Sequence, residues 1–347
     1  MTSNPLSGCE RRSHLVDERL RRRLAMPPGR SLAIRNGCRD RQMSNPDPSI
    51  TARCDAIAIL NPETGRRPAD DLEVLLRRVL EQRYNLDIQR STYPGEARRL
   101  AERAAAQADL VIAVGGDGTV REVVAGMRDT PATLGIIPNG SANVVARGLG
   151  IPIDPAGAAR ALVGPTASQS LDIVVSDDDC FVHMAGAGFD GLMMRDTSPS
   201  LKRAVGWLAY FPPALSHLDD QIYHYRITVD HTTVTADARM VLLANGSFVL
   251  HPRFPIGREI RADDGLLDVC IFTPPDFAST ASVAGLFALG LVDRSPHFQQ
   301  LTGKTVRIES YPPAPVEFDG DFVGTTPIAV RIQPAAVEVC LPAPLAK

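Results

Sequence analysis

The most constraining feature of the sequence is an apolar stretch that runs directly into a glycine-rich loop. Residues 108–114 are mostly apolar, and Gly115-Gly116-Asp117-Gly118-Thr119 follows them. Such a stretch is typical of a strand buried on both faces of a parallel sheet. Glycine lets the backbone approach a ligand closely, and the free N–H groups at the start of a helix bind phosphate. The pattern therefore predicts a phosphate-binding loop between this strand and a helix over 119–127.

A tight turn without a ligand is the alternative interpretation of this loop. Thr119 and Glu122 have the spacing of a capping box, which would fix the start of the helix locally. A turn without a ligand would not need a carboxylate at position 117. The carboxylate of Asp117 suits a metal ion or an oriented water molecule. The sequence contains no G-x-x-x-x-G-K-[ST], which argues against a P-loop protein, and the glycine-rich loop itself does not have the G-x-G-x-x-G spacing of the usual dinucleotide fold.

Strands and helices alternate through the first half of the chain. Hydrophobic periodicity predicts strands over 56–60, 86–89 and 133–137, and helices over 69–80, 95–107 and from Ser141 onward. This alternation predicts an open, mostly parallel α/β sheet, whose ligand lies beyond the carboxyl ends of the strands. The loops 61–66 and 138–143 should reach the same edge as the glycine-rich loop, with Ser141 capping the helix that follows it.

After about residue 170 the pattern becomes that of a β-rich domain. Alternating segments bounded by Gly, Pro and Asp predict strands at 171–175, 181–185, 223–229, 233–243, 267–272, 305–308, 316–318, 328–332 and 337–341. Helical patterns occur at 201–215 and 277–291. The first of these helices would suit a lipid interface, although packing against the second domain is an equally good interpretation.

Composition and charge narrow the class of protein. With 347 residues, 44% of them apolar, and a net charge of -3, the chain should form about two domains and shows no sign of nucleic-acid binding. Its six cysteines include no C-x-x-C pair, which argues against a zinc cluster or a disulfide framework and favours the cytoplasm. The least polar stretch, 281–292, is too short for a transmembrane segment. Any membrane contact should therefore be peripheral, at the inner face.

Residues 1–53 differ from the rest of the chain in charge. They carry 11 arginines and five acidic residues and lack a sustained apolar period, which predicts a basic, disordered leader. A phospholipid-attracting arm is one interpretation, and a start assigned too early, with Met43 as the alternative first residue, is the other. The predicted domains are then an α/β domain over 54–170 and a β-rich domain over 171–343.

Several motifs in a fixed order give the chain a family resemblance. After the glycine-rich loop come Gly188-Phe189-Asp190, Asp263-Asp264-Gly265-Leu266-Leu267-Asp268 and Phe318-Asp319-Gly320-Asp321. The ordered set resembles the diacylglycerol kinase catalytic-domain family, specifically the soluble bacterial lipid kinases related to sphingosine kinases. The resemblance implies an N-terminal nucleotide-kinase-like (NAD kinase-like) α/β domain with an open parallel sheet, a C-terminal β-sandwich, and ATP bound in the cleft between them.

The resemblance also implies roles for individual residues. Nucleotide contacts fall on Asn61, Arg66, Thr92, Gly115, Gly116, Asp117, Gly118, Thr119, Val120, Arg121 and Ser141. Asp117 and Asp172 would organise a catalytic Mg²⁺ through water, and Asp264 with the carbonyls of Arg261 and Leu266 would hold a structural Mg²⁺. Asp319 and Asp321 occupy the D-G-E motif that supplies the catalytic base. Without the resemblance, Asp319-Gly320-Asp321 would be interpreted as a β-turn.

Three residues depart from the family pattern. Val144 stands where many members have Asp, Ser141 replaces Thr, and Asp321 replaces Glu. The predicted function is an ATP- and Mg²⁺-dependent kinase that phosphorylates a lipid hydroxyl, on diacylglycerol or a sphingoid-like acceptor, at a membrane surface. The alternatives are an NAD kinase, which shares G-G-D-G-T, and a nucleotide-binding regulatory module without turnover, which Val144 would favour. The sequence leaves a homodimer open.

Overall fold

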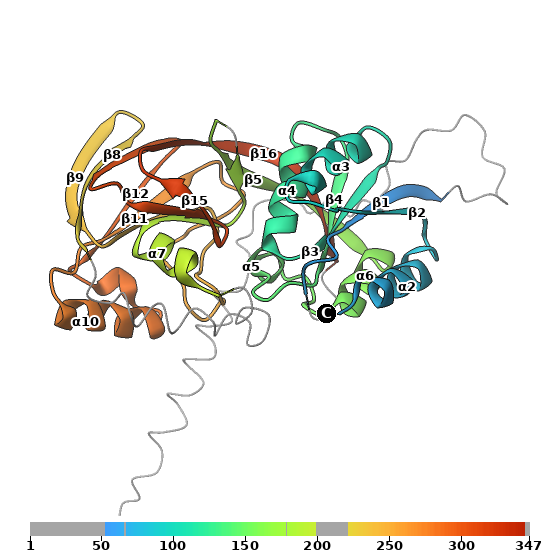
Figure 1. Ribbon diagram of the computed structural model, residues 1–347, viewed down its shortest axis with the longest axis horizontal. Helices are drawn as coiled ribbons and strands as arrows, with labels where there is room; N and C mark the ends of the chain where they lie inside the picture. The colour runs from blue at the N-terminus through green and yellow to red at the C-terminus, as the bar shows by residue number, and fades with distance from the viewer. Residues whose placement is uncertain (1–52, 66, 178, 199–220, 344–347) are drawn as a thin grey trace, which may run out of the picture. The chain divides into compact units, whose positions relative to one another are not determined.

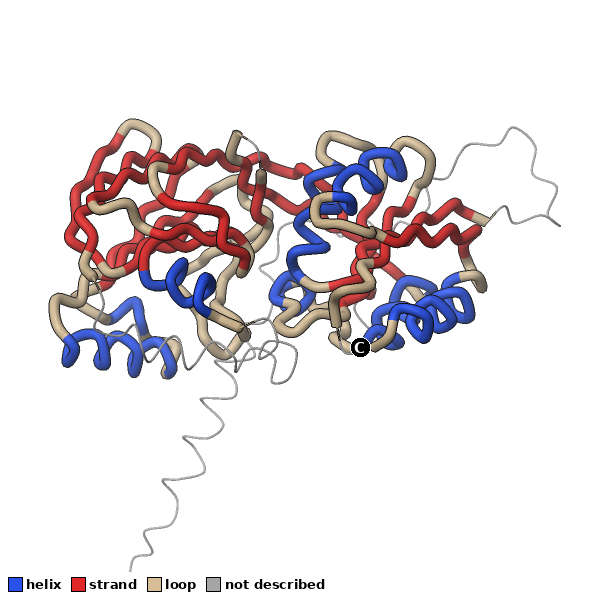
Figure 2. The backbone as a smooth tube through the Cα atoms, in the orientation of Figure 1, coloured by secondary structure: helices blue, strands red, loops and turns tan. Residues whose placement is uncertain are grey.

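The computed structural model describes residues 53–65, 67–177, 179–198 and 221–343. Arg66, the helix predicted at 201–215 and the predicted leader apart from Arg53 lie outside these residues. Within them, α-helices and strands alternate up to about residue 163, and strands dominate after it (Figure 2).

The first part of the chain forms a parallel sheet with helices on both faces. Its strands, in the spatial order β2-β1-β3-β4, are β1 (Cys54–Leu60), β2 (Tyr84–Arg90), β3 (Leu110–Gly115) and β4 (Thr133–Pro138). Its helices are α2 (Ala69–Leu80), α3 (Glu96–Ala105), α4 (Asp117–Met127), α5 (Val144–Gly148) and α6 (Pro155–Val163). Helices α2 and α6 pack together on one face of the sheet, and α3 and α4 on the other (Figure 1).

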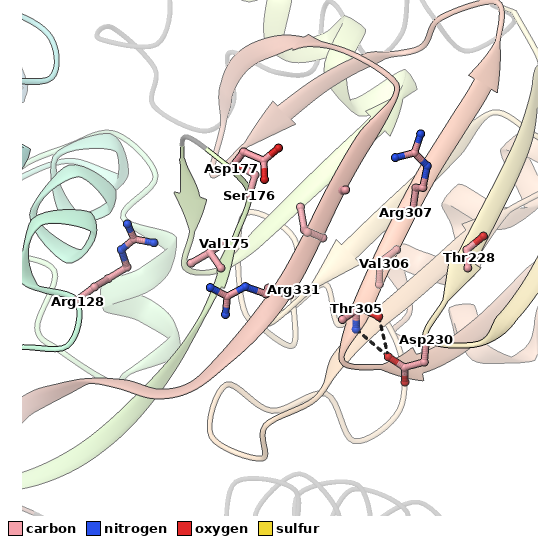
Figure 3. Close-up of a pocket in the computed structure, with 12 residues that line it drawn as sticks. Arg128, Val175, Ser176, Asp177, Thr228, Asp230, Thr305, Val306, Arg307 and Arg331 are labelled. Atoms are coloured by element: carbon pink, nitrogen blue, oxygen red, sulfur yellow. Dashed lines mark hydrogen bonds between the residues drawn. The ribbon is translucent and has the colours of Figure 1, made fainter.

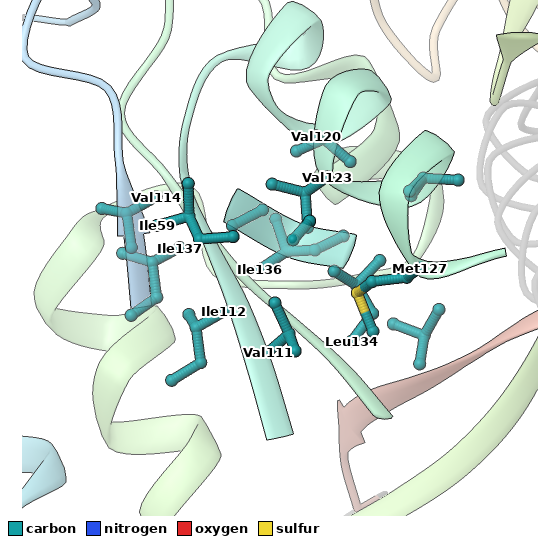
Figure 4. Close-up of a cluster of buried hydrophobic side chains, with 14 of the residues drawn as sticks. Ile59, Val111, Ile112, Val114, Val120, Val123, Met127, Leu134, Ile136 and Ile137 are labelled. Carbon is teal, nitrogen blue, oxygen red and sulfur yellow. The ribbon is translucent and has the colours of Figure 1, made fainter. Parts of the chain in front are cut away.

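Burial of apolar side chains explains this arrangement. All six residues of β3 are buried, as expected for a central strand covered on both faces. Leu72, Leu75, Leu76 and Val79 form the buried stripe of α2. Val120, Val123 and Met127 of α4 belong to the same buried apolar core as the side chains of β3 and β4 (Figure 4).

The second part of the chain is an antiparallel β-sandwich. One sheet has the order β12-β11-β10-β7-β14-β15, and β8, β9 and β13 belong to the other. The strands are β6 (Cys180–Phe181), β7 (Met184–Gly188), β8 (Tyr223–Val229), β9 (Thr232–Ala238), β10 (Met240–Ala244), β11 (Leu267–Phe272), β12 (Phe298–Gly303), β13 (Thr305–Tyr311), β14 (Pro315–Phe318) and β15 (Asp321–Thr325). A continuous apolar core lies between the two sheets. The helical elements here are α7 (Phe189–Asp196), α10 (Phe277–Ala288) and the short 3₁₀ helix η2 (Val292–Arg294).

Two long strands join the two parts into one ten-stranded sheet. β16 (Ile328–Pro342) pairs antiparallel with β13 through its first residues and parallel with β4 through Glu338 and Val339. β5 (Thr166–Val175) pairs with β16 along nearly its whole length. The sequence predicted two separate strands at 328–332 and 337–341, which is wrong because a register shift between Gln333 and Val337 bends one continuous strand.

A further strand prediction is wrong because the chain passes from one sheet to the other. The segment 233–243 was predicted as one strand, but the chain changes sheet at Arg239 and forms β9 and β10. Strands β12 and β15 and helices α6 and α7 were not predicted. No helix in the described ranges is long and apolar enough to cross a membrane. Cys180, Cys270 and Cys340 are free and buried.

Candidate functional site

Three loops meet at the carboxyl edge of the parallel sheet, as the alternation of strands and helices predicted. The backbone N–H of Asn61, after β1, donates to the carbonyl of Val114 at 3.1 Å, and that of Asn139, after β4, donates to Gly115 at 2.7 Å. The Asn61 side chain donates to the Thr119 hydroxyl at 3.2 Å. The predicted nucleotide residues Asn61, Gly115 and Thr119 therefore belong to one network.

The close approach of these loops requires glycine at two positions. A Cβ on Gly140 would lie 2.5 Å from the Cα of Gly116, and a Cβ on Gly65, whose φ is +101°, would lie 2.0 Å from the carbonyl oxygen of Asn139. The Asn139 side chain also donates to the carbonyl of Thr64 at 2.9 Å. Backbone therefore packs directly on backbone beside the start of α4, where free N–H groups face outward.

The helix caps in this region differ from the prediction. Helix α4 begins at Asp117 after Gly116, so Thr119 lies inside the helix and the capping box with Glu122 is wrong. The Glu122 carboxylate instead accepts from the N–H groups of Gly95 at 3.0 Å and Ala97 at 3.1 Å. It thereby ties the start of α3 to α4, a contact between helices that local spacing does not reveal.

Ser141 is likewise not the cap that the sequence predicted. Helix α5 begins at Val144, with Asn143 before it in the left-handed region at φ +51°. A side chain from another helix accepts a hydrogen bond from the start of α5: the Val145 N–H donates to Asp117 Oδ1 at 3.1 Å. Asp117, the first residue of one helix, is thus the anionic cap of another.

The environment of Asp117 changes its acidity. Burial disfavours the charged carboxylate and raises the pKa of Asp117 to about 6, the N–H groups of Val145 and Val144 oppose this, and the charge of Asp319 adds to it. A cation next to this carboxylate would stabilise its charged form. Asp117 thus suits the magnesium role that the resemblance implies, although the buried Val144 supplies only its backbone N–H where a second carboxylate was expected.

Asp319 lies in the hairpin turn between β14 and β15, Asp321 is the first residue of β15, and the environments of the two carboxylates differ. Asp319 has φ +47° and is 7% exposed. Its carboxylate accepts from three backbone N–H groups, those of Val182 at 2.7 Å, His183 at 2.8 Å and Met184 at 3.1 Å. Burial raises the pKa of Asp319, and these three donors act in the opposite direction. The Asp319 carboxylate is therefore held firmly inside the second domain.

Asp321 faces the glycine-rich loop. Its side chain is 52% exposed and accepts from the guanidinium of Arg121 at 3.1 Å. A Cβ added to Gly118 would lie 2.9 Å from Asp321 Oδ2. Arg121 also donates to the carbonyl of Phe318 at 3.1 Å and lies 3.7 Å from Asp179. The guanidinium of Arg121, predicted as a nucleotide contact, thus joins α4 to the turn of the second domain.

The remaining predicted magnesium residues form a separate group. Asp172 in β5 is 2% exposed, and its carboxylate accepts from the N–H groups of Gly265 at 2.6 Å and Ala335 at 2.7 Å. Its contacts therefore group Asp172 with the Asp264 loop. Burial raises the pKa of Asp264, and the charges of Asp268 and Asp172 raise it further.

This concentration of negative charge fits a cation at the Asp264 loop. One carboxylate with the carbonyls of Arg261 and Leu266 would be an all-oxygen ligand set of the kind that Mg²⁺ prefers. Across the described ranges, however, no group of three or more His, Cys, Asp or Glu side chains is placed to hold a metal. The Arg261 side chain donates to Asp263 at 3.0 Å.

Thr92 lies in the loop after β2, at the same edge of the sheet. Its N–H and hydroxyl donate to Glu96 at 2.6 and 2.7 Å, and the neighbouring Ser91 N–H donates to Leu60 at 2.9 Å.

A pocket of about 620 Å³, shown in Figure 3, lies away from the predicted site. It is lined by residues that include Arg128, Arg307 and Arg331, and none of the predicted site residues belongs to it. Asp190 and Glu317 form a buried acidic pair behind the turn. From the sequence, Asp190 was noted only as part of a family motif, without a role, and Glu317 was missed, although an acidic residue within the apolar run of β14 is its signal.

Two family models match most of the described residues. Residues 55–174 match the model of the diacylglycerol kinase catalytic domain, and residues 183–341 match the YegS C-terminal NAD kinase beta sandwich-like domain. A probable lipid kinase YegS-like from Pseudomonas putida is 32% identical over 267 residues, covering 74% of this chain and 86% of that protein. The diacylglycerol kinase of Bacillus subtilis is 27% identical over 285 residues, covering 78% and 90%.

Solved structures show the same fold. A putative diacylglycerol kinase from Bacillus anthracis superposes with a TM-score of 0.71 at 22% sequence identity, covering 83% of this chain and 96% of that one. The fold and these matches define a phosphotransferase that acts on an alcohol group. The chain belongs to the diacylglycerol kinase catalytic-domain family. The predicted fold class, an NAD kinase-like α/β domain followed by a β-sandwich, is confirmed.

The loop contact at Gly140 is open to direct test. Gly140→Ala is expected to lower the melting temperature, because its Cβ would overlap the Gly116 backbone. The matched control is Gly285→Ala in α10, where an added Cβ meets nothing within 4 Å. The control should gain up to about 1 kcal/mol from helix propensity. Equal thermal stability of Gly140→Ala and wild type would contradict the contact.

The raised pKa of Asp117 predicts a pH-dependent stability. The unfolded carboxyl ionises near an ordinary pKa of about 3.9 and the folded one near 6, so its contribution is fully present at low pH and is lost between about pH 4 and pH 6. Asp117→Asn, which keeps an oxygen acceptor for Val145, should flatten this decline in urea unfolding measured across that range. The exposed control Asp71→Asn should not. A decline of unchanged steepness in Asp117→Asn would show that another group causes it.

Proposed function

We propose that the protein is an ATP- and Mg²⁺-dependent lipid kinase that transfers the γ-phosphoryl group to a hydroxyl of diacylglycerol or a sphingoid-like lipid. The observation that carries this proposal is the contact between Asp321 of the second domain and Gly118 at the start of α4. It brings a half-exposed carboxylate to the loop where phosphates would bind. The names of the relatives, diacylglycerol kinase and lipid kinase, support the acceptor class.

The chain's own groups suffice to position the reactants. Backbone N–H groups of the loop 115–119 and the start of α4 would bind the phosphates of ATP, and Asn61 and Asn139 hold that loop in place. Asp117 would hold Mg²⁺, directly or through water, and the ion would neutralise charge on the phosphate oxygens. Thr92 and Ser141 lie on neighbouring loops at the same edge. The proposed division of labour is a nucleotide domain at 54–170 and a lipid-substrate domain at 171–343.

Asp321 is the better placed of the two turn carboxylates to act as the base. The carboxylate of Asp319 already accepts three N–H groups, whereas Asp321 is half exposed and faces the loop. The lipid hydroxyl would give its proton to Asp321 as its oxygen bonds to the γ-phosphorus and the bond to ADP breaks. Asp319 would then fix the turn that presents Asp321. A peripheral, cytoplasmic location at the membrane follows from this acceptor and is part of the proposal.

Transfer of labelled phosphate from [γ-³²P]ATP to a lipid extract in detergent micelles tests this function. Asp321→Asn should lower kcat by about 10²–10⁴ with ATP binding retained, the range expected when general-base catalysis is removed. Asp117→Asn should also weaken the dependence on Mg²⁺, and the exposed control Asp87→Asn should behave as wild type.

Three other outcomes would each support a different assignment. Full activity in Asp321→Asn would exclude it as the base and leave Asp319 as the candidate. Label in NAD instead of lipid would revive the NAD kinase alternative. ATP binding without any labelled product would indicate the regulatory module that Val144 favoured.

A further inference from the structure

Two acidic side chains are buried together behind the Asp319–Asp321 turn. Glu317 of β14 is 1% exposed, and Asp190, in the first turn of α7, is 3% exposed. Helix α7 packs on β14 and β7, and the two carboxyl groups lie within hydrogen-bonding reach of each other. The proposed mechanism uses neither of them.

Close backbone packing keeps water away from this pair. A Cβ on Gly186 of β7 would lie 2.3 Å from Asp190 Oδ2, and one on Gly191 of α7 would lie 2.3 Å from the carbonyl oxygen of Pro315. Helix α7 therefore rests directly on the backbone of the two strands. The Asp190 carboxyl occupies the space that a side chain on Gly186 would need.

The hydrogen bonds of the pair are incomplete if both groups are ionised. Glu317 Oε2 accepts from the Gly320 N–H at 2.6 Å. Glu317 Oε1 and Asp190 Oδ2 are buried and have no hydrogen-bond partner among the described residues. A carboxylate is only an acceptor, and a buried acceptor without a donor is costly. A single proton on either group supplies the missing donor and joins the two.

The charges around the pair also favour one proton. Burial and the neighbouring Asp190 raise the pKa of Glu317, and burial raises that of Asp190. Among the described residues, Asp319 is a further charged group that acts on Glu317, and it repels a second negative charge. Asp321, on the adjacent strand β15, is paired with Arg121. Two carboxyl groups in contact seldom ionise together at neutral pH.

We propose that Asp190 and Glu317 share one proton in the folded protein and that this pair positions the Asp319–Asp321 turn through the Gly320 N–H. The first half of the proposal is independent of the kinase function, whereas the second rests on it. Glu317 accepts from the Gly320 N–H on the buried side of the turn, and Asp321 faces the proposed phosphate-binding loop on the exposed side. Glu317 and Asp190 are positioning residues, since neither reaches the loop itself.

Proton uptake on folding tests the shared proton. A bound proton that the unfolded chain lacks makes the unfolding equilibrium constant rise by about tenfold per pH unit. Glu317→Gln and Asp190→Asn each replace the proton with an amide donor, so each should lose this rise between about pH 5 and 7 relative to wild type. Both variants should also lose the infrared band of a protonated carboxyl at neutral pH. The exposed control Glu102→Gln should keep slope and band. Unchanged slopes and band in both variants would overturn the shared proton.

Turnover and amide exchange test the positioning role. Glu317→Ala, which removes the acceptor for Gly320, should lower kcat about tenfold or more with the KM for ATP nearly unchanged, and Glu317→Gln should restore it. If Glu317→Ala does not fold, exchange of the Gly320 amide in wild type decides, because exchange as fast as that of an exposed amide would overturn the role. Wild-type kcat in folded Glu317→Ala would do the same. An inactive wild type with the predicted proton uptake would refute the kinase function alone.

Discussion

The rest of the structure depends on the pairing of β16 with strands from both halves of the chain. Its first residues pair with β13 of the sandwich, and Glu338 and Val339 pair with β4 of the parallel sheet. Because β4 ends in the loop that packs on Gly116, the strand that pairs with both β13 and β4 connects the sandwich to the edge of the sheet that carries the glycine-rich loop. The contact of Asp321 with α4 follows from this shared backbone.

Carboxylates of one chemical type acquire different properties from their surroundings in this site. Burial raises the pKa of Asp117 to about 6, and its carboxylate caps α5. The Asp319 carboxylate accepts hydrogen bonds from three backbone N–H groups. Asp321 remains half exposed beside Arg121. Glu317 is buried against another carboxyl group. Within five residues, therefore, the Asp319 carboxylate is held by backbone donors, the Asp321 carboxylate is half exposed, and the Glu317 carboxyl is buried and accepts from the Gly320 N–H.

Local patterns in the sequence predicted much of the first domain, because its elements depend on local periodicity. The run ending at Val114, the stripe of α2 and the meeting of three loops at one edge all follow from spacing along the chain. The caps could not be predicted, because Asp117 caps α5 and Glu122 caps α3 across gaps of 28 and 25 residues. The continuity of β16 was missed since its register shift interrupts the alternation.

The candidate site was predictable only in part for the same reason. Ordered motifs brought Asp319 and Asp321 to attention, but their opposite environments depend on Val182, His183 and Arg121, which are distant in sequence. The grouping of Asp172 with Asp264 also arises from a long-range contact, the bond from Gly265 to Asp172. Residue types marked the candidate carboxylates, and tertiary contacts determine the burial and hydrogen bonding of each one.

A crystal structure with a non-hydrolysable ATP analogue and Mg²⁺ would test the central claim most directly. The account predicts the phosphates at the N–H groups of residues 115–119, with the γ-phosphorus near Asp321 and the metal near Asp117. Phosphates bound elsewhere, or a γ-phosphorus on the side of the loop away from the Asp319–Asp321 turn, would contradict it.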